Sequence, residues 1–241
     1  MISIVIPTFY EEKIIGSTLS SLASQLTLPH EIIVSDGGSR DSTVEIAAKY
    51  ADRVVVHQGV ERQTIAQGRN AGAKEARGEF LVFLDADCFV PDPDKFFQIA
   101  ISNFAKFANL VALTSFLRVL PGNETAADKI VLGSVNLMVL LRNNFLKKGE
   151  VPGGEFQMIR REAFNQVGGY NEDLVTREDR DMFFRLSEIG RTLCDPRLVV
   201  FHTGRRAHRL GWLHMIGLFL VNTLYFHASG RIRSKEWTLV R

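Results

Sequence analysis

The first half of the chain alternates short apolar runs with segments of helical periodicity, and this alternation restricts the fold more than any other feature. Four runs rich in β-branched and aromatic residues have the length of buried strands: 2–6, 31–35, 53–56 and 80–84. The segments between them are expected to be helices, near 11–25, 41–50 and 62–76. Strands that alternate with helices form a parallel sheet covered on both faces. We therefore predict an α/β fold with a mostly parallel sheet flanked by helices.

The second half is less regular. Its expected elements are a long apolar helix from about 125 to 147, a Gly153-Gly154 turn, a strand near 156–159, a helix that starts at Glu178 and a strand near 198–201. No internal repeat, low-complexity tract or linker interrupts the chain. One domain over 1–204 is therefore expected, followed by a basic and apolar extension over 205–241.

Polar residues follow three of the predicted strands directly. They are Pro7-Thr8 after the first run, Asp36-Gly37-Gly38-Ser39 after the second and Asp85-Ala86-Asp87 after the fourth. In open α/β sheets, ligands bind outside the carboxyl ends of the strands. The three clusters are therefore expected to converge on one crevice.

Asp85 and Asp87 would lie about 6 to 7 Å apart along an extended backbone. Two carboxylates at this spacing repel each other unless a cation lies between them, and a hard divalent cation prefers oxygen ligands. The same pair also suits a turn before a helix that begins at Asp92. Asp36 similarly has two interpretations, because DGGS can present a carboxylate to a nucleobase or ribose and can equally be a plain turn. The segment is not a GxGxxG dinucleotide motif.

Five segments, taken in order, resemble glycosyltransferase family 2: IPTFYEEKII, EIIVSDGGSRDST, GRNAGAKEARGEFLVFLDAD, RREAFNQVGGYNEDL and REDRDMFFRL. The resemblance covers about residues 1–202. It implies the GT-A fold, with a Rossmann-like nucleotide-sugar half over 1–120 and an acceptor half over 121–204. It also implies an inverting hexosyltransferase that uses a nucleotide-diphosphate sugar, an acceptor hydroxyl and a divalent metal, Mg²⁺ or Mn²⁺.

The resemblance assigns roles to individual residues. Those expected to bind the nucleotide sugar are Pro7, Thr8, Glu11, Asp36, Arg69, Asp85, Asp87, Gly153 and Gly154. Asp85 and Asp87 would hold the metal and the diphosphate. Two positions depart from the family pattern: Tyr10 stands where Asn is usual, and Gly37 where many members have a second aspartate. The nucleobase therefore cannot be inferred.

An inverting transfer needs a carboxylate that takes the proton from the attacking hydroxyl. The resemblance gives this role to Asp179, with Asp181 as the alternative, although acids at a helix N-terminus also stabilise the helix dipole. His202 ends a predicted strand, where a structural role is common. In many GT-A enzymes a late histidine completes the metal shell, and the resemblance makes His202 the expected third metal ligand or a phosphate contact, with Arg205 or Arg206 near the departing diphosphate.

Two rival functions are weighed against glycosyl transfer. A nucleotidyltransferase would place a glycine-rich, basic loop after the first strand, whereas PTFYEE contains neither glycine nor base. A catalytically inactive nucleotide-sugar-binding or lipid-binding module would not need to keep its acids. The presence of Asp36, Asp85, Asp87 and Asp179 argues against it.

Charge is distributed unevenly. The net charge is only +2, which argues against a nucleic-acid partner, but residues 203–241 carry +6 and residues 1–202 carry −4. The run 210–226 has no charged residue and is shorter than the about 20 residues that span a bilayer. It suits a helix at an anionic membrane surface, or a helix buried in the core or in an oligomer.

Cys88 and Cys194 match no metal spacing and are expected to be reduced, buried thiols, and the N-terminus lacks the pattern of a signal peptide. A cytoplasmic protein at the cytoplasmic face of the membrane is therefore expected. Its acceptor could be lipid-linked, as in polysaccharide or glycolipid biosynthesis.

Overall fold

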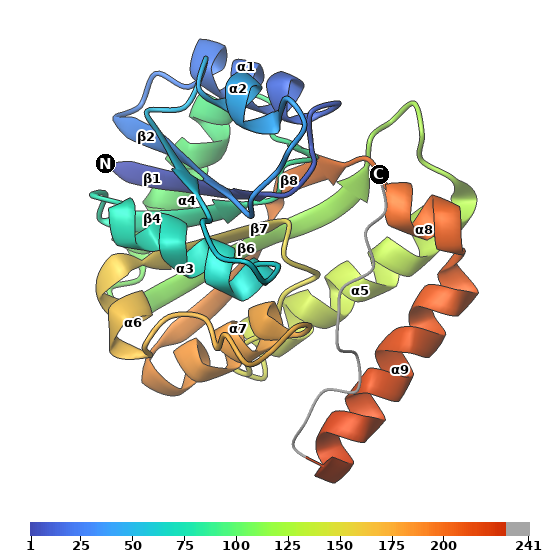
Figure 1. The fold of residues 1–241 in the computed structure, drawn as a ribbon. Coiled ribbons are helices and arrows are strands. Elements are labelled where there is room, and N and C mark those ends of the chain that lie inside the picture. Colours follow the sequence, from blue (N-terminus) through green and yellow to red (C-terminus); the bar gives the residue numbers. More distant parts are fainter. Residues whose placement is uncertain (230–241) are drawn as a thin grey trace.

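The computed structural model describes residues 1–229 (Figure 1). Its elements, in chain order, are β1 (Ile2–Thr8), α1 (Ile15–Gln25), β2 (His30–Asp36), α2 (Thr43–Ala47), β3 (Arg53–Val56), α3 (Ile65–Glu75), β4 (Phe80–Leu84), β5 (Cys88–Phe89), α4 (Pro93–Lys106), β6 (Leu110–Val119), α5 (Ala126–Asn144), β7 (Phe156–Arg160), α6 (Arg161–Gln166), α7 (Glu178–Ile189), β8 (Arg191–His202), α8 (Arg205–Leu210) and α9 (Trp212–Ser229). The four strands predicted in the first half are all present, and the helix predicted to start at Glu178 does so.

The strands form a single mixed sheet in the order β3-β2-β1-β4-β7-β6-β8-β5. The four strands from β3 to β4 are parallel, as the alternating pattern predicts. Beyond β4 the sheet changes character, because β7 runs antiparallel to both β4 and β6, while β8 is parallel to β6 and antiparallel to β5. The α/β fold is thus confirmed, and its second half is mixed.

Strand β6 was not among the predicted strands, and only the end of β8 was. Strand β8 is interrupted by a bulge: Ser115 pairs with Asp195, but the next residue of β6, Phe116, pairs with Val199. The bulged segment contains Pro196, which has no N–H to donate to a ladder. The proline divides the apolar pattern of β8, so the pattern alone shows only the part after it.

Two apolar clusters cover the two faces of the sheet. Alternate residues of each strand point to opposite sides, so Ile4 and Val82 face one cluster and Val5 and Phe83 the other. The first cluster includes residues of α1 and α4, and the second includes residues of α3, α6 and α7. Figure 1 shows α1 and α2 on one side of the sheet and α3, α6 and α7 on the opposite side. The sheet is therefore the middle of three layers.

Helix α5 begins with a capping box, in which Thr125 and Asp128 exchange hydrogen bonds between side chain and backbone. The helix lies near β6 and β8, and α8 and α9 follow the end of β8. Among residues 1–229, no helix combines the length and the hydropathy that crossing a bilayer requires. Cys88 and Cys194 are free and buried, as expected. The part of the predicted C-terminal extension from 230 to 241 lies outside the described residues.

Candidate functional site

The carboxyl ends of β1 and β2 meet at Thr8 and Asp36, which are paired across the ladder. The Thr8 hydroxyl donates to Asp36 Oδ2 at 2.9 Å. Asp36 also accepts from Gly38 N and Ser39 N through Oδ1, at 3.0 and 2.7 Å, and from the Ser39 hydroxyl through Oδ2 at 2.7 Å. Both oxygens of this buried carboxylate are thus used to build the turn, as the plainer interpretation of DGGS predicts. Contact with a base or ribose stays a prediction.

Pro7 lies in β1, and Gly68 of α3 faces it. A Cβ at Gly68 would approach the Pro7 ring to 3.6 Å, which is ordinary contact. Close packing of α3 on β1 depends instead on Gly72, where a Cβ would lie 2.4 Å from Val5 Cγ1. Since α3 also carries Arg69, this packing sets the position of the arginine relative to the strand ends.

Arg69 is the largest fully buried side chain, with 1% of its surface exposed. Its Nη1 donates to Glu178 Oε1 at 2.9 Å, and its Nη2 donates to Asp85 Oδ1 at 3.0 Å and to the carbonyl of Gly154 at 3.1 Å. Burial alone would lower the pKa of Arg69, but the surrounding acids, Asp85 above all, raise it. The guanidinium stays charged and joins β4, the Gly153-Gly154 turn and α7.

Close approach requires a glycine at 154. A Cβ there would lie 2.2 Å from Arg69 Nη2, and the buried guanidinium is fixed by three hydrogen bonds. A Cβ at Gly153 would lie 2.1 Å from Glu155 Oε2, which is the end of a flexible side chain and can shift. The turn therefore exposes bare backbone next to Asp85, while its role in lining a donor–acceptor cleft stays a prediction.

Asp87 and Glu11 are linked by Arg205, which comes from the first turn of α8. The guanidinium donates to both Glu11 oxygens, at 2.7 and 2.8 Å, and its Nε lies 3.2 Å from Asp87 Oδ2. The Thr203 hydroxyl also donates to Asp87 Oδ2, at 2.6 Å. A residue distant in sequence thus supplies the positive charge beside two predicted ligand-binding acids.

Asp179 lies in the first turn of α7, next to Glu178. Burial raises the pKa of Asp179, and the Arg69 charge opposes that shift. Burial, followed by the Asp179 charge, raises the pKa of Glu178 to about 8. A carboxylate with a raised pKa is a better proton acceptor. Asp181 points elsewhere, since its Oδ2 accepts from Arg185 Nε at 2.8 Å on the same helix.

Glu155 is a member of this acidic group that the sequence did not indicate. Burial, followed by the charge of Asp85, raises the pKa of Glu155 to about 8. Its Oε2 is buried and has no hydrogen-bond partner among the described residues. The residue lies opposite the end of β4, because its carbonyl accepts from Asp85 N at 3.3 Å. Only the antiparallel pairing of β4 and β7, which the sequence did not predict, brings it there.

His202 lies beside the acidic pair, because it pairs with Cys88 across β5 and β8. Its Nε2 is buried without a hydrogen-bond partner among the described residues, and burial lowers the pKa of the imidazole. A neutral ring with a free nitrogen suits a metal ligand, as do the oxygens of Asp85 and Asp87. Within residues 1–229, however, no three His, Cys, Asp or Glu side chains form a ready metal site. The donor types fit a divalent cation, but they are not assembled around one.

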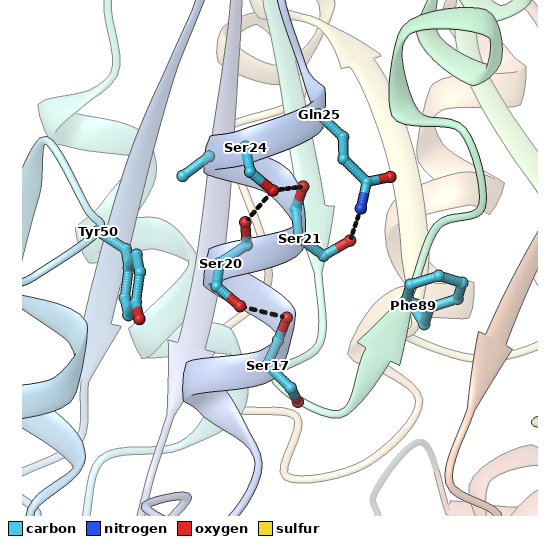
Figure 2. Close-up of a pocket in the computed structure, with 8 residues that line it drawn as sticks. Ser17, Ser20, Ser21, Ser24, Gln25, Tyr50 and Phe89 are labelled. Carbon is cyan, nitrogen blue, oxygen red and sulfur yellow. Dashed lines mark hydrogen bonds between the residues drawn. The ribbon is translucent and has the colours of Figure 1, made fainter.

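A hollow over α1 has fewer side chains suited to catalysis or metal binding. It is lined by Ser17, Ser20, Ser21, Ser24, Tyr50 and Phe89, among others (Figure 2). The hydroxyls of Ser20 and Ser24 donate to carbonyls one turn earlier, at 3.2 and 2.7 Å. Among the described residues, no charged side chain lines the hollow. We therefore assign the candidate site to the carboxylates at the strand ends.

Comparison with known proteins agrees with this geometry. Residues 3–168 match the sequence model described as Glycosyl transferase family 2. The chain is 27% identical over 188 residues to an uncharacterized glycosyltransferase of Haemophilus influenzae, which covers 77% of this chain and 62% of that protein. It is 26% identical over 182 residues to the poly-beta-1,6-N-acetyl-D-glucosamine synthase of Staphylococcus epidermidis, covering 73% of this chain and 43% of that protein.

Among solved structures, a mannosyltransferase from Pyrobaculum calidifontis in complex with GDP-Man and Mn²⁺ has a TM-score of 0.69 at 18% identity. The match covers 89% of this chain and 61% of that one. A similarity at this level of identity shows a shared fold. The chain spans less than two thirds of the length of each of these three proteins.

Proposed function

Because the chain belongs to glycosyl transferase family 2, we propose that it transfers a hexose from a nucleotide-diphosphate sugar to an acceptor hydroxyl with inversion. One observation carries the proposal. Arg69 bonds both Asp85, at the end of β4, and Glu178, beside Asp179. The group proposed to bind the diphosphate and the residue directly before the proposed base are therefore held on one buried cation. In a single displacement, the departing diphosphate and the acceptor hydroxyl that the base deprotonates must both lie at the anomeric carbon.

Asp179 is proposed as the general base. Its raised pKa and its place among buried acids support a group that takes the proton from the acceptor hydroxyl. Asp181 is the weaker alternative, because its carboxylate pairs with Arg185. Direct displacement forms no covalent bond between enzyme and sugar, so no nucleophilic side chain is required.

The nucleotide side of the site is proposed to comprise Pro7, Thr8, Glu11 and Asp36, with Asp85 and Asp87 at the diphosphate. Mg²⁺ or Mn²⁺ would be held by Asp85, Asp87 and His202. When bound, such a cation stabilises the negative charge of the departing diphosphate. The solved mannosyltransferase with GDP-Man and Mn²⁺ supports this choice of cofactor. Arg205 lies beside the Asp87 carboxylate and is proposed to contact the departing diphosphate.

We also propose that the protein works at the cytoplasmic face of a membrane, on a lipid-linked or membrane-proximal acceptor of polysaccharide or glycolipid synthesis. The charge of +6 over residues 203–241 supports attraction to an anionic surface. The polysaccharide synthase among the relatives supports an acceptor of this class.

Hydrolysis of common nucleotide sugars, assayed with Mn²⁺ and with Mg²⁺, tests the function directly. The wild type is expected to release nucleoside diphosphate from at least one donor, and a chelator should abolish the release. An inactive sugar-binding module would bind a donor and release nothing. A nucleotidyltransferase would instead release pyrophosphate from a nucleoside triphosphate and a sugar phosphate.

A further inference from the structure

Helix α5 presents polar residues to the protein interior. Asp128, Asn136 and Asn143 are 0%, 5% and 1% exposed. The side chain of Asn136 bonds the backbone of β6 as an adjacent strand would: it accepts from Leu117 N at 3.0 Å and donates to the Leu117 carbonyl at 2.9 Å. Asn143 donates to the carbonyl of Glu150 at 2.7 Å. These buried polar groups have partners, so hydrogen bonds hold α5 on the sheet together with the buried Leu132 and Val139.

The opposite face of α5 is apolar and exposed. Ile130, Leu137 and Leu141 are 70%, 55% and 44% exposed, and their spacing places them on one side of the helix. Met138, Phe145 and Leu146 extend the exposed apolar surface at the C-terminal end. A surface helix of a globular protein ordinarily turns its apolar side inward. An outward apolar side of this size indicates a partner surface.

Helix α9 adds to the same surface. Its exposed apolar residues are Leu213, Ile216, Leu218 and Val221. The start of α9 is fixed to α5, because Trp212 Nε1 donates to Asp128 Oδ1 at 2.7 Å and Trp212 packs near Leu132. His208 of α8 contacts Asp128 Oδ2 at 2.8 Å. Figure 1 shows α5 and α9 on the same side of the molecule, away from α1 and α2. We call the exposed apolar residues of these two helices the α5–α9 face.

Over residues 121–150 and 205–229, the exposed charged residues are all basic. Every acid between residues 121 and 150 is buried or nearly so: the side chain of Glu124 is 5% exposed, and Asp128 and Glu150 are 0% and 2% exposed. The bases Lys129, Lys147, Lys148 and Arg209 are exposed. No acid occurs between 205 and 229. A second copy of this chain would bring lysines against lysines, whereas an anionic lipid surface complements both the apolar side chains and their basic rim.

We propose that the α5–α9 face lies on an anionic lipid surface, with its apolar side chains among the acyl chains and its lysines at the headgroups. The site is connected to this face. Arg142 of α5 lies 3.2 Å from Glu150, and Glu150 accepts two hydrogen bonds from Arg180 at 2.6 Å. Arg180 follows the proposed base Asp179 and donates to it from its backbone N–H. These contacts join the face to the proposed base. The acceptor is therefore placed on the membrane side of the site, an inference that rests on the proposed function.

Flotation of the full chain with vesicles tests the surface without any substrate. Wild-type protein should bind vesicles that contain one third phosphatidylglycerol and bind pure phosphatidylcholine vesicles less. The double variant Leu137→Glu and Leu141→Glu should lose binding roughly tenfold or more, since it removes apolar contact and adds repulsion. Both residues are exposed, so its melting temperature should match that of the wild type. Val60→Glu, which adds one negative charge at an exposed apolar residue outside the face, is the control for a glutamate placed elsewhere.

The double variant Leu137→Gln and Leu141→Gln separates apolar contact from charge, and Lys147→Glu with Lys148→Glu tests the rim. Each should weaken binding to the anionic vesicles. Equal binding by the wild type and both leucine variants would overturn the proposal. So would a wild-type dimer, without vesicle binding, that the glutamate variant converts to monomer, because the face would then join two copies. Donor hydrolysis is measured separately. Its absence in a wild-type protein that binds vesicles would reject the proposed enzyme function and leave the surface proposal standing.

Discussion

Two arginines hold the carboxylates of the candidate site, and they do so in different surroundings. Arg69 comes from the core helix α3 and joins Asp85 to Glu178 with 1% of its side chain exposed. Arg205 comes from the short helix α8 and joins Glu11 to Asp87 with 29% exposed. We call the first group the inner end of the site and the second group the outer end.

The two arginines differ in burial, although their acids do not follow the same order: Asp85 is 34% exposed, whereas Glu11 and Asp87 are 8% and 13% exposed. The difference between the arginines gives the two ends different properties. A buried charge is tolerated only when its partners are all in place, and removing one partner leaves an uncompensated ion. A partly exposed pair is screened by water and contributes little to stability. The inner end is therefore expected to be fixed in one geometry. At the outer end, another cation is expected to replace Arg205 beside Asp87 with little loss of free energy. A site that binds and releases a charged diphosphate requires such an exchange.

The largest effect is expected from breaking the inner end. Arg69→Met leaves Asp85 and Glu178 without their shared cation, and the free energy of unfolding should fall by about 3–5 kcal/mol. Urea denaturation at neutral pH measures it. Arg69→Lys keeps the charge but not the forked geometry and should lose less. A loss below about 1 kcal/mol for the Met variant would mean that the two ends do not differ as described.

The proposed base gives the next largest effect. Asp179→Asn should lower kcat roughly 10²-fold or more because a general base is lost, while the dissociation constant of the donor stays near the wild-type value. Steady-state kinetics and calorimetry check the two halves of this prediction. Asp181→Asn is the matched control on the same turn. If Asp181→Asn were inactive and Asp179→Asn near wild type, the role of base would pass to Asp181.

Asp87→Asn tests the outer end as a ligand site. Binding of Mn²⁺ and of nucleoside diphosphate should weaken together by about tenfold or more, since even the outer-shell partners of metals contribute on that scale. Isothermal titration in the presence and absence of a chelator measures both. Diphosphate binding that is unchanged and insensitive to chelator would remove Asp87 from the metal site.

Arg205→Gln should have a smaller effect of the opposite sign. Removing a guanidinium that competes for Asp87 should strengthen binding of Mn²⁺ alone by about two- to fivefold, the scale of a partly exposed ion pair. Arg209→Gln removes one charge from an exposed position of the same helix and should leave Mn²⁺ affinity nearly unchanged. Weaker Mn²⁺ binding in Arg205→Gln would show that Arg205 supports the site instead of competing for it.

A separate effect, seen only when the pH is changed, concerns the pH dependence of stability. Burial raises the folded-state pKa of Glu155 to about 8, above the ordinary value of 4.5, so the folded state binds the proton more tightly than the unfolded state. The stabilisation is therefore complete below about pH 4.5 and is lost as pH rises toward 8. Glu155→Gln should flatten the fall in the free energy of unfolding over this interval, measured in chelator-treated buffer. An unchanged slope would mean that Glu155 does not titrate in this range.

The sequence by itself determined what depends on local pattern. The strands of the parallel half and the helix starts near Asp92, Thr125 and Glu178 were predictable, because each depends on residues within one or two turns of chain. The motifs also indicated the family correctly. Strand β6 was missed, and the bulge that contains Pro196 hid most of β8.

The tertiary structure alone decided which groups meet. Arg205 and Glu11 are 194 residues apart, and Glu155 reaches Asp85 only through the antiparallel pairing of β4 and β7. The apolar pattern of 125–147 predicted a helix but could not say which side faces outward, because the inward side is held by the hydrogen bonds of Asn136 and Asn143. Local periodicity determines whether a segment forms a helix or a strand. Long-range pairing decides what its side chains contact, and the compensation of charge at this site depends on such long-range contacts.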